Sequence, residues 1–301
     1  MKPDYKNWVP KSMVYGLACG TVAAFILFLL LGATGTIFHG TPRLICGIIF
    51  GIGTLVLLFF TVWMSALHIT FDYNGKRKLA KAIIEGTANY VKLPDGGTGL
   101  DVGCGSGALT IASAKRNPKA VMVGCDIWSG AYKAVFTKKR CEDNAKAEGV
   151  TNVRFEEGNA IRLPFKDESF DAVTSNYVYH NISGYDKQKL LLETLRVLKK
   201  GGTFAIHDLM SAARYGDMDA FVKKLNAEGY EDVHLIDTTD GTFMGKKEAA
   251  WLGLAGSTLL VGKKKKKIMI SGACVMRKRF SRLKDLPSRN ATAGPYQYPI
   301  L

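Results

Sequence analysis

The sequence predicts a doubly wound α/β domain that follows a hairpin of two transmembrane helices. Three observations lead to this prediction. Strand and helix patterns alternate between residues 98 and 264, as in a parallel sheet with helices on both faces. A glycine-rich turn, "GCGSG", separates the first of these strands from the helix after it. Two long apolar runs without a charged residue come before the alternation.

The two apolar runs are Met13–Phe38 and Leu44–Leu67. Each exceeds the roughly 20 residues that a helix needs to cross the hydrocarbon core, so we expect both to span a membrane, within an anchor of residues 1–70. Only His39–Arg43 separates them, which predicts a tight hairpin with both chain ends on one side. A cleaved signal peptide or a lipoprotein at Cys19 agrees less well, because a second apolar run follows and the long run comes after that cysteine.

Basic residues flank the hairpin unevenly. The connection between the runs holds only Arg43, whereas the outer flanks hold seven basic residues: Lys2, Lys6, Lys11, Lys76, Arg77, Lys78 and Lys81. Because positive charge favours the cytoplasmic side, we expect an integral membrane protein with both termini and the α/β domain in the cytoplasm.

Two pairs of glycines in the apolar runs have the spacing G-x-x-x-G, namely Gly16 with Gly20 and Gly47 with Gly51. This spacing lets helix backbones approach closely in lipid. It predicts close packing within the hairpin, or a homodimer formed through these helix faces.

The expected domain covers residues 71–264 and begins with a helix. In residues 71–91, Leu79, Ile83 and Ile84 have the spacing of a core-facing helix side, with Lys and Glu outside. Further helix patterns cover residues 108–116, 131–149, 186–200 and 217–229, and glycines end the last three.

Seven segments of the domain predict strands. The run "AVMVGCD" is apolar throughout, as in a strand buried on both faces. The run "FDAVTSN" ends in small polar residues. The expected strands cover residues 98–103, 120–126, 153–160, 170–176, 203–209, 231–238 and 257–264.

The formal charge of +15 is concentrated at the C-terminus. From Lys263 onward there are eleven basic residues and one acidic residue, Asp285. We therefore expect residues 265–301 to form a basic, flexible tail that binds anionic lipid headgroups or is simply solvated. We expect no nucleic-acid partner for the domain.

The six cysteines form no C-x-x-C pair and the five histidines are scattered, so neither disulfides nor a metal site are expected.

The glycine-rich turn predicts a nucleotide site. Gly103, Gly105 and Gly107 allow a tight turn and close approach of a ligand to the N-terminus of the next helix. Asp126, nineteen residues after Gly107, ends the second strand, where its carboxylate can accept hydrogen bonds from ribose hydroxyls. These residues alone suit either a nicotinamide dinucleotide or S-adenosylmethionine.

Four longer segments separate the two cofactors. "LDVGCGSG", "VGCDIW", "EEGNAIRLPFKDESFDAV" and "LRVLKKGGTFAIHDL" resemble the Rossmann-like S-adenosylmethionine-dependent methyltransferases over most of the domain. The resemblance implies a seven-stranded sheet whose last strand is antiparallel. It also implies S-adenosylmethionine as cofactor and S-adenosylhomocysteine as product.

The resemblance assigns cofactor contacts to positions of this chain. Gly103, Gly105 and Gly107 would line the methionine part, Asp101 would orient its amino group, and Asp126 would hold the ribose. Ile127 or Trp128 would pack on adenine, with Asn159 and Ala160 near its amino group. Ser175 and Asn176 would lie beside the sulfonium, and Tyr73 would belong to an N-terminal lid.

The acceptor is expected beside Ser175–Asp186, which follows the fourth strand. Tyr177, Tyr179 and Asn181 would form a wall there, and His180 would act as general base or orient the substrate. The alternative for His180 is a hydrogen bond to the local backbone. His207, at the end of the fifth strand, is a second candidate for contact with substrate.

These observations predict a membrane-anchored methyltransferase that acts by in-line displacement on a small lipophilic acceptor, such as a lipid, quinone, thiol, phenol or amine. Two other functions remain open at this point. One is an NAD(P)-dependent oxidoreductase, and the other is a non-catalytic membrane adaptor that binds S-adenosylmethionine.

Overall fold

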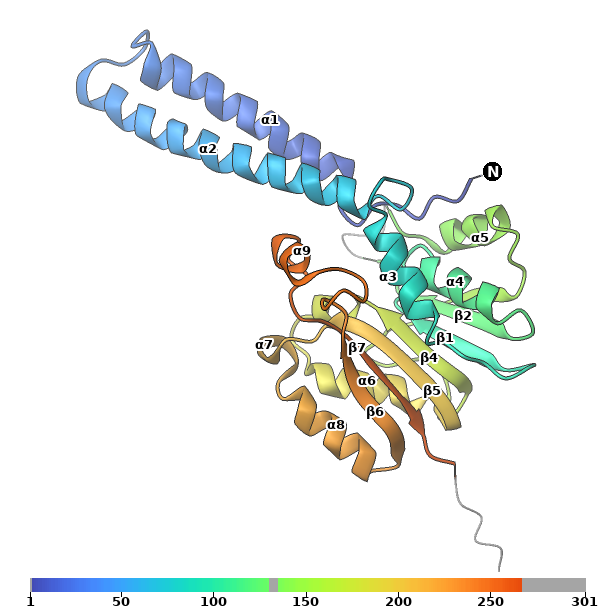
Figure 1. Cartoon of the computed structure of the whole chain (residues 1–301). Coiled ribbons are helices and arrows are strands. Elements are labelled where there is room, and N and C mark those ends of the chain that lie inside the picture. Colours follow the sequence, from blue (N-terminus) through green and yellow to red (C-terminus); the bar gives the residue numbers. More distant parts are fainter. Residues whose placement is uncertain (1, 130–134, 267–301) are drawn as a thin grey trace, which may run out of the picture. The chain divides into compact units, whose positions relative to one another are not determined.

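The computed structural model describes residues 2–129 and 135–266 of the 301-residue chain. All seven predicted strands are present in one sheet with the order β3-β2-β1-β4-β5-β7-β6 (Figure 1). Strand β7 alone runs antiparallel to the other six strands, which confirms the predicted fold class. The strands are β1 Thr98–Val102, β2 Val121–Asp126, β3 Val153–Glu157, β4 Phe170–Asn176, β5 Leu198–Leu209, β6 Tyr230–Asp237 and β7 Ser257–Lys264.

Helices cover both faces of the sheet (Figure 1). On one face lie α3 Leu79–Ala88, α4 Ala108–Arg116 and α5 Lys138–Ala147, and on the other lie α6 Lys187–Arg196 and α8 Met218–Ala227. Leu79, Ile83 and Ile84 are buried on α3, as their spacing predicts. The short helices are η3 Tyr179–Asn181, α7 Ala212–Tyr215 and α9 Lys246–Trp251.

Helices α3, α5, α6 and α8 are all shorter than predicted. Helix α5 begins at Lys138, because the Thr137 hydroxyl caps it by accepting from Arg140 N at 3.1 Å; the earlier predicted residues 131–134 lie outside the described part. Helix α6 ends at Arg196 and not at residue 200. Leu198 is fully buried and pairs with Phe170, so the residues expected to end the helix start β5 instead.

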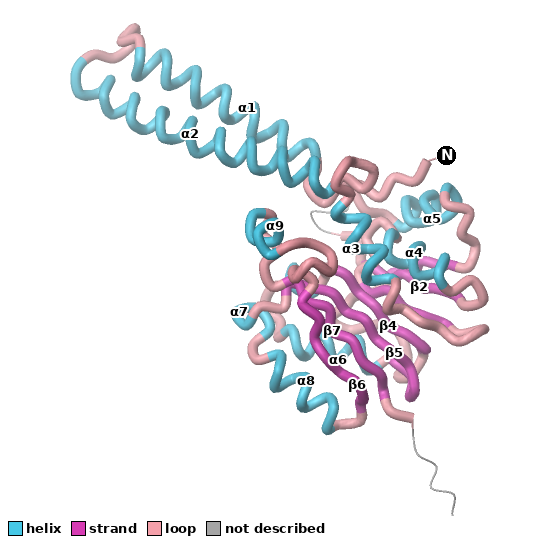
Figure 2. The backbone as a smooth tube through the Cα atoms, viewed as in Figure 1, coloured by secondary structure: helices cyan, strands magenta, loops and turns pink. Residues whose placement is uncertain are grey.

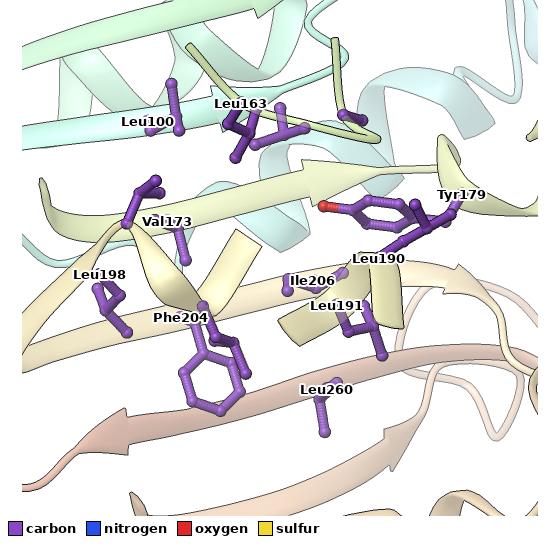
Figure 3. Close-up of a cluster of buried hydrophobic side chains, with 14 of the residues drawn as sticks. Leu100, Leu163, Val173, Tyr179, Leu190, Leu191, Leu198, Phe204, Ile206 and Leu260 are labelled. Atoms are coloured by element: carbon purple, nitrogen blue, oxygen red, sulfur yellow. The ribbon is translucent and has the colours of Figure 1, made fainter. Parts of the chain in front are cut away.

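The largest apolar core joins the sheet to α6 and α8. Val173, Phe204, Ile206 and Leu260 point from the strands toward leucines of α6 (Figure 3). Burial of this kind contributes roughly 25 cal/mol per Å² of apolar surface. The core fixes the strand ends that build the site.

The hairpin consists of α1 Lys11–Leu27, continued by the π-helix η1 Phe28–Ala33, and α2 Gly40–Phe71 (Figure 2). The connection is residues 34–39 and not the expected His39–Arg43. Pro42 fits the first turn of α2 because no helical hydrogen bond needs its missing N–H there.

Small residues let the two long helices approach each other. A Cβ added to Gly32 would lie 2.4 Å from the Gly47 Cα, and one added to Gly51 would meet the Phe28 ring at 3.4 Å. A Cβ at Gly16 would meet nothing within 4 Å. The Gly47–Gly51 pair therefore serves packing within the hairpin, whereas Gly16 lies on an open face.

Both long helices, Lys11–Ala33 and Gly40–Phe71, have the length and composition to cross a membrane. Their apolar side chains are exposed: Leu44 is 64% and Leu55 67% exposed. The last turns of α2 differ, because Leu67 and Phe71 are buried against the α/β domain.

The residues before α1 also pack on the domain. We call Asp4–Val9 the N-terminal strap. Asp4 N donates to Asn144 Oδ1 at 2.7 Å, and Arg140 pairs with the Asp4 carboxylate at 2.8 Å. At the other end of the strap, His68 Nδ1 lies 2.7 Å from Val9 O. The strap therefore contacts α5 of the α/β domain at one end and α2 of the hairpin at the other.

The lysine run at the C-terminus begins inside the domain. Lys263 pairs with Glu231 at 3.1 Å, Lys264 Nζ donates to Leu198 O at 2.8 Å, and Lys265 Nζ donates to an α8 carbonyl. All three lysines therefore contact the protein itself, and binding of the tail to headgroups stays a prediction. The rest of the expected tail, residues 267–301, lies outside the described part.

Candidate active site

A cavity of about 700 Å³ opens at the carboxyl ends of β1, β2 and β4. This volume is in the usual range for small-molecule sites, and the edge of the sheet is where doubly wound folds bind ligands. The predicted site residues that line it are Asp101, Gly103, Gly105, Asp126, Ile127, Trp128, Asn159, Ala160, Asn176, Tyr177, His180 and Asn181.

The glycine turn has the backbone that its sequence predicts. Gly103, Gly105 and Gly107 all have positive φ, a backbone conformation that residues other than glycine rarely adopt. A Cβ at Gly103 would lie 2.4 Å from Val178 Cγ2, whereas one at Gly105 would meet nothing closer than 3.9 Å. The loop is thus tight at Gly103 and open to a ligand at Gly105. Gly107 lies behind the cavity wall and starts α4, so its expected contact with the cofactor is corrected to a packing role.

Asp126 braces the turn. Its Oδ2 accepts from Gly105 N and its Oδ1 accepts from Trp128 N, both at 2.9 Å. The Trp128 indole donates to Gly105 O at 3.0 Å. A carboxylate offers about four acceptor positions, so Asp126 can still accept from ribose hydroxyls while it holds the loop.

Asp101 is a buried acid beside the cavity. Burial raises the pKa of Asp101 to about 7; the hydrogen bond from Thr110 Oγ1, at 2.6 Å, lowers it, and the nearby Asp126 charge raises it further. No cation of the described residues pairs with it. A ligand ammonium group would supply the missing positive charge, so the site fits an amino-acid moiety here.

Asn159 lies in the loop after β3. Its Oδ1 accepts from Ile161 N at 2.9 Å, and the residue is exposed to the cavity. Ala160 beside it is buried and also lines the cavity. Both residues lie at the cavity, and their contact with adenine stays a prediction from the resemblance.

His180, which lines the cavity, forms a dyad with the buried Asp208. His180 Nδ1 lies 2.5 Å from Asp208 Oδ1. Burial alone would raise the pKa of Asp208, but the hydrogen bond and charge of His180 and the Leu209 N–H hold it below its usual value. Among the described residues, nothing bonds to His180 Nε2, which leaves this nitrogen for a ligand.

Tyr179 and Ser175 do not reach the cavity, and their predicted roles are wrong. Tyr179 is fully buried in the core between the sheet and α6, where its hydroxyl meets Thr194 Oγ1 at 2.6 Å (Figure 3). The Ser175 hydroxyl donates to Val102 O at 2.8 Å. Both side chains point to the side of the strand end that faces the core.

His207 is also a structural residue. Its ring nitrogens lie 2.8 Å from Asn176 Oδ1 and 2.9 Å from Thr238 Oγ1, and the residue is completely buried. Burial lowers the pKa of His207 to about 3, against the opposing effect of the Asp208 charge. It is absent from the cavity lining, so the expected contact with substrate is corrected.

Tyr73 does not cover the cavity either. Its ring packs on the Tyr5 ring with centroids 4.6 Å apart, and burial raises its pKa. Trp8, Val9 and Phe71 line the cavity instead. The sequence does not single out Trp8 as a site residue, because a tryptophan next to an apolar run also suits a membrane boundary.

Comparison with known proteins matches the α/β domain to methyltransferases. A family model described as a methyltransferase domain matches residues 100–206. The uncharacterized methyltransferase YcgJ of Bacillus subtilis is 35% identical over 130 residues, which are 42% of this chain and 46% of that protein. The chain thus spans less than half of that relative's length. A demethylmenaquinone methyltransferase of Bacillus cytotoxicus is 30% identical over 181 residues, 56% of this chain and 73% of that protein.

A solved structure, that of the [4+2]-cyclase SpnF, matches with a TM-score of 0.48 at 21% identity over 65% of this chain and 85% of that chain. The sequence relatives decide between the two cofactors that the glycine turn left open. The chain belongs to the Rossmann-like S-adenosylmethionine-dependent methyltransferases, and S-adenosylmethionine is its cofactor.

Proposed function

We propose that this methyltransferase is anchored in a membrane and methylates a small lipophilic acceptor, such as a lipid, quinone, thiol, phenol or amine. The observation that carries the proposal is the composition of one cavity. It is lined by the cofactor residues Asp101 and Asp126, by His180, and by Val9 and Phe71, which flank the two apolar helices.

Different residues of the cavity have different roles in methyl transfer. Bound S-adenosylmethionine supplies a methyl group that its sulfonium activates. Asp101 and Asp126 fix the position of the cofactor, and Trp8 and Val9 shield the cavity from water. Alignment of two reactants in this way can contribute roughly 7–11 kcal/mol.

His180 is the proposed general base. His180 lines the cavity and Asp208 holds its Nδ1, which leaves Nε2 to take a proton from the acceptor as the methyl group arrives. The buried Asp208 carboxylate stabilises the imidazolium that forms. A stabilised cation on His180 suits acceptors that lose a proton, such as thiols, phenols and hydroquinones.

The relatives favour one acceptor class among these. Several matched proteins, including that of Bacillus cytotoxicus, are named demethylmenaquinone methyltransferase. A quinone-type acceptor is lipophilic, and its reduced form carries hydroxyl groups that His180 could deprotonate. We therefore place a hydroquinone first among the candidate acceptors.

The proposed topology puts both termini and the catalytic domain in the cytoplasm. The support is the excess of basic residues outside the hairpin. The one basic residue near the hairpin tip, Arg43, donates to the carbonyls of Gly32 and Ala33 that end the first helix.

Membrane lipids are the proposed surroundings of the hairpin, and no nucleic-acid partner is proposed. A homodimer through the first helix stays a proposal, supported by the open face at Gly16. This face is apolar, and close approach of two copies there needs no rearrangement within the hairpin.

Incubation of the full-length protein with methyl-labelled S-adenosylmethionine and a fractionated membrane extract tests the proposal. We expect label in a product that partitions into organic solvent. Label confined to water-soluble products would reject the lipophilic acceptor. Cofactor binding without transfer to any fraction would instead favour the non-catalytic adaptor.

A further inference from the structure

We propose that the foot of the hairpin is part of the acceptor site, and that it holds the apolar tail of an amphiphile with an uncharged head. The head faces His180, and the tail lies against Val9, Phe71 and Leu254. This inference rests on the proposed function, but it assigns a binding role to residues next to the membrane spans.

One group of apolar residues in the cavity wall lies close to His180. Val9, Phe71, Leu209 and Leu254 line the cavity and belong to one apolar cluster, on which Trp8 and Tyr177 pack. The Tyr177 ring in turn lies next to that of His180, with centroids 6.0 Å apart. Such a wall binds hydrocarbon and offers little to a polar ligand.

The apolar wall continues into the hairpin without a break. Val9, Phe71 and Leu254 belong to one apolar cluster with Leu67 of α2, and Val14 and other residues of the two long helices pack against it. A hydrocarbon chain that leaves the cavity along this cluster would therefore remain in contact with apolar side chains up to the helices.

The position of the wall along the chain places it at the membrane boundary. Phe71 is the last residue of α2, and Val9 comes two residues before α1 begins. The Trp63 indole of α2 donates to Trp251 O at 2.8 Å, which fixes the segment before Leu254 to the hairpin. Tryptophans at this level are typical of the membrane–water interface.

Charge restricts the head of the ligand. No lysine or arginine occurs among the described residues that line the cavity, and its two carboxylates, Asp101 and Asp126, lie at the cofactor end. A phosphate or carboxylate head would be buried there without a counter-charge, which is costly. A neutral head with an O–H or S–H group, by contrast, meets His180 Nε2.

The test compares two hydroquinones that differ only in their tail, one with a decyl chain and one with a methyl group. Full-length protein in nanodiscs is assayed with methyl-labelled cofactor. We expect kcat/KM for the decyl compound to exceed that for the methyl compound by about a hundredfold or more, because several methylenes of the decyl chain leave water on binding. Equal values would overturn the inference and leave the methyltransferase function intact.

Two leucines of the same cluster provide a matched pair of variants. Leu254 and Leu252 are 9% and 6% exposed, but only Leu254 lines the cavity. We expect Leu254→Ala to raise KM for the decyl compound about tenfold and to leave KM for the methyl compound nearly unchanged. Leu252→Ala should change neither KM. Equal effects of both variants would contradict a tail contact at Leu254.

A binding measurement decides the inference if neither hydroquinone is methylated. Protein saturated with S-adenosylhomocysteine is heated with each compound, and the shift in melting temperature reports binding. A larger shift with the decyl compound, reduced in Leu254→Ala but not in Leu252→Ala, supports the inference. The same shift with both compounds rejects it, whatever the fate of the proposed function.

Discussion

His180 Nδ1 lies 2.5 Å from Oδ1 of the buried Asp208, and the same carboxylate accepts from the backbone N–H groups of Tyr179 and His180. These contacts fix the orientation of the imidazole against the cavity. The dyad joins the loop after β4 to the end of β5, two segments that the sequence separates by 27 residues.

Substitution of His180 tests the dyad. We expect His180→Ala to lower kcat by about 10²–10⁴, the usual contribution of a positioned base, with little change in the affinity for S-adenosylmethionine. Asn181→Ala is the control, because Asn181 lines the same cavity but has no acid partner. A pH–rate profile that keeps its acidic limb in His180→Ala would rule out the role of base.

The glycine turn should tolerate no side chain at Gly103. A Cβ there would overlap Val178, and φ is +72°, so Gly103→Ala should displace the loop and abolish cofactor binding. Gly149→Ala is the matched control, with φ +67° and free space around the added Cβ. It should cost about 1–2 kcal/mol of stability and leave cofactor affinity unchanged. Calorimetric titration with S-adenosylhomocysteine measures both affinities, and retained binding in Gly103→Ala would contradict the account.

Asp101 should make the cofactor-free protein less stable as pH rises. Its pKa of about 7 exceeds the ordinary value of 3.8, so the folded state holds a proton that the unfolded state has lost. Below pH 4 Asp101 does not change the free energy of unfolding. Between pH 4 and pH 7 this free energy falls, and above pH 7 the loss is on the order of 4 kcal/mol. An ammonium group bound beside Asp101 should reduce the loss. Thermal unfolding of wild type and Asp101→Asn between pH 5 and pH 8 measures it. Parallel pH curves for both proteins would refute it.

His207 should have the opposite effect on stability, which it should make rise with pH. Because its pKa is about 3 in the folded state and near 6.5 in the unfolded state, its stabilising effect is complete above pH 6.5 and is lost as pH falls toward 3. His207→Gln should therefore lower stability at pH 7 by roughly 1–3 kcal/mol, through lost hydrogen bonds, but flatten the acid side of the stability curve. KM for the acceptor should stay the same. A large rise in KM would restore His207 to the substrate site.

Much of the fold follows from local patterns in the sequence. The strands stand out because buried parallel strands are apolar throughout, and the cofactor loop because only glycine takes its backbone angles. The end of α6 differs from the prediction because "VLKK" also has a helical pattern, and its pairing with β4 makes it the start of a strand.

The errors in the site have a different origin. Tyr179 and His180 are adjacent, yet one faces the core and the other the cavity, and sequence does not reveal how a short turn orients them. Trp8 and Val9 fall within the anchor that the sequence predicts, because their neighbours in the cavity, such as Tyr177 beside Trp8, lie far along the chain. Asp208 gains its role only when β5 lies beside β4.

The most direct measurement of the central claim follows labelled methyl groups in native membranes. Full-length wild type and Gly103→Ala are added with methyl-labelled S-adenosylmethionine, and label is counted in the organic-soluble fraction. The account predicts label in a lipophilic product with wild type and background counts with Gly103→Ala. Equal counts for both proteins, or label only in the aqueous fraction, would contradict methyl transfer to a membrane acceptor at this site.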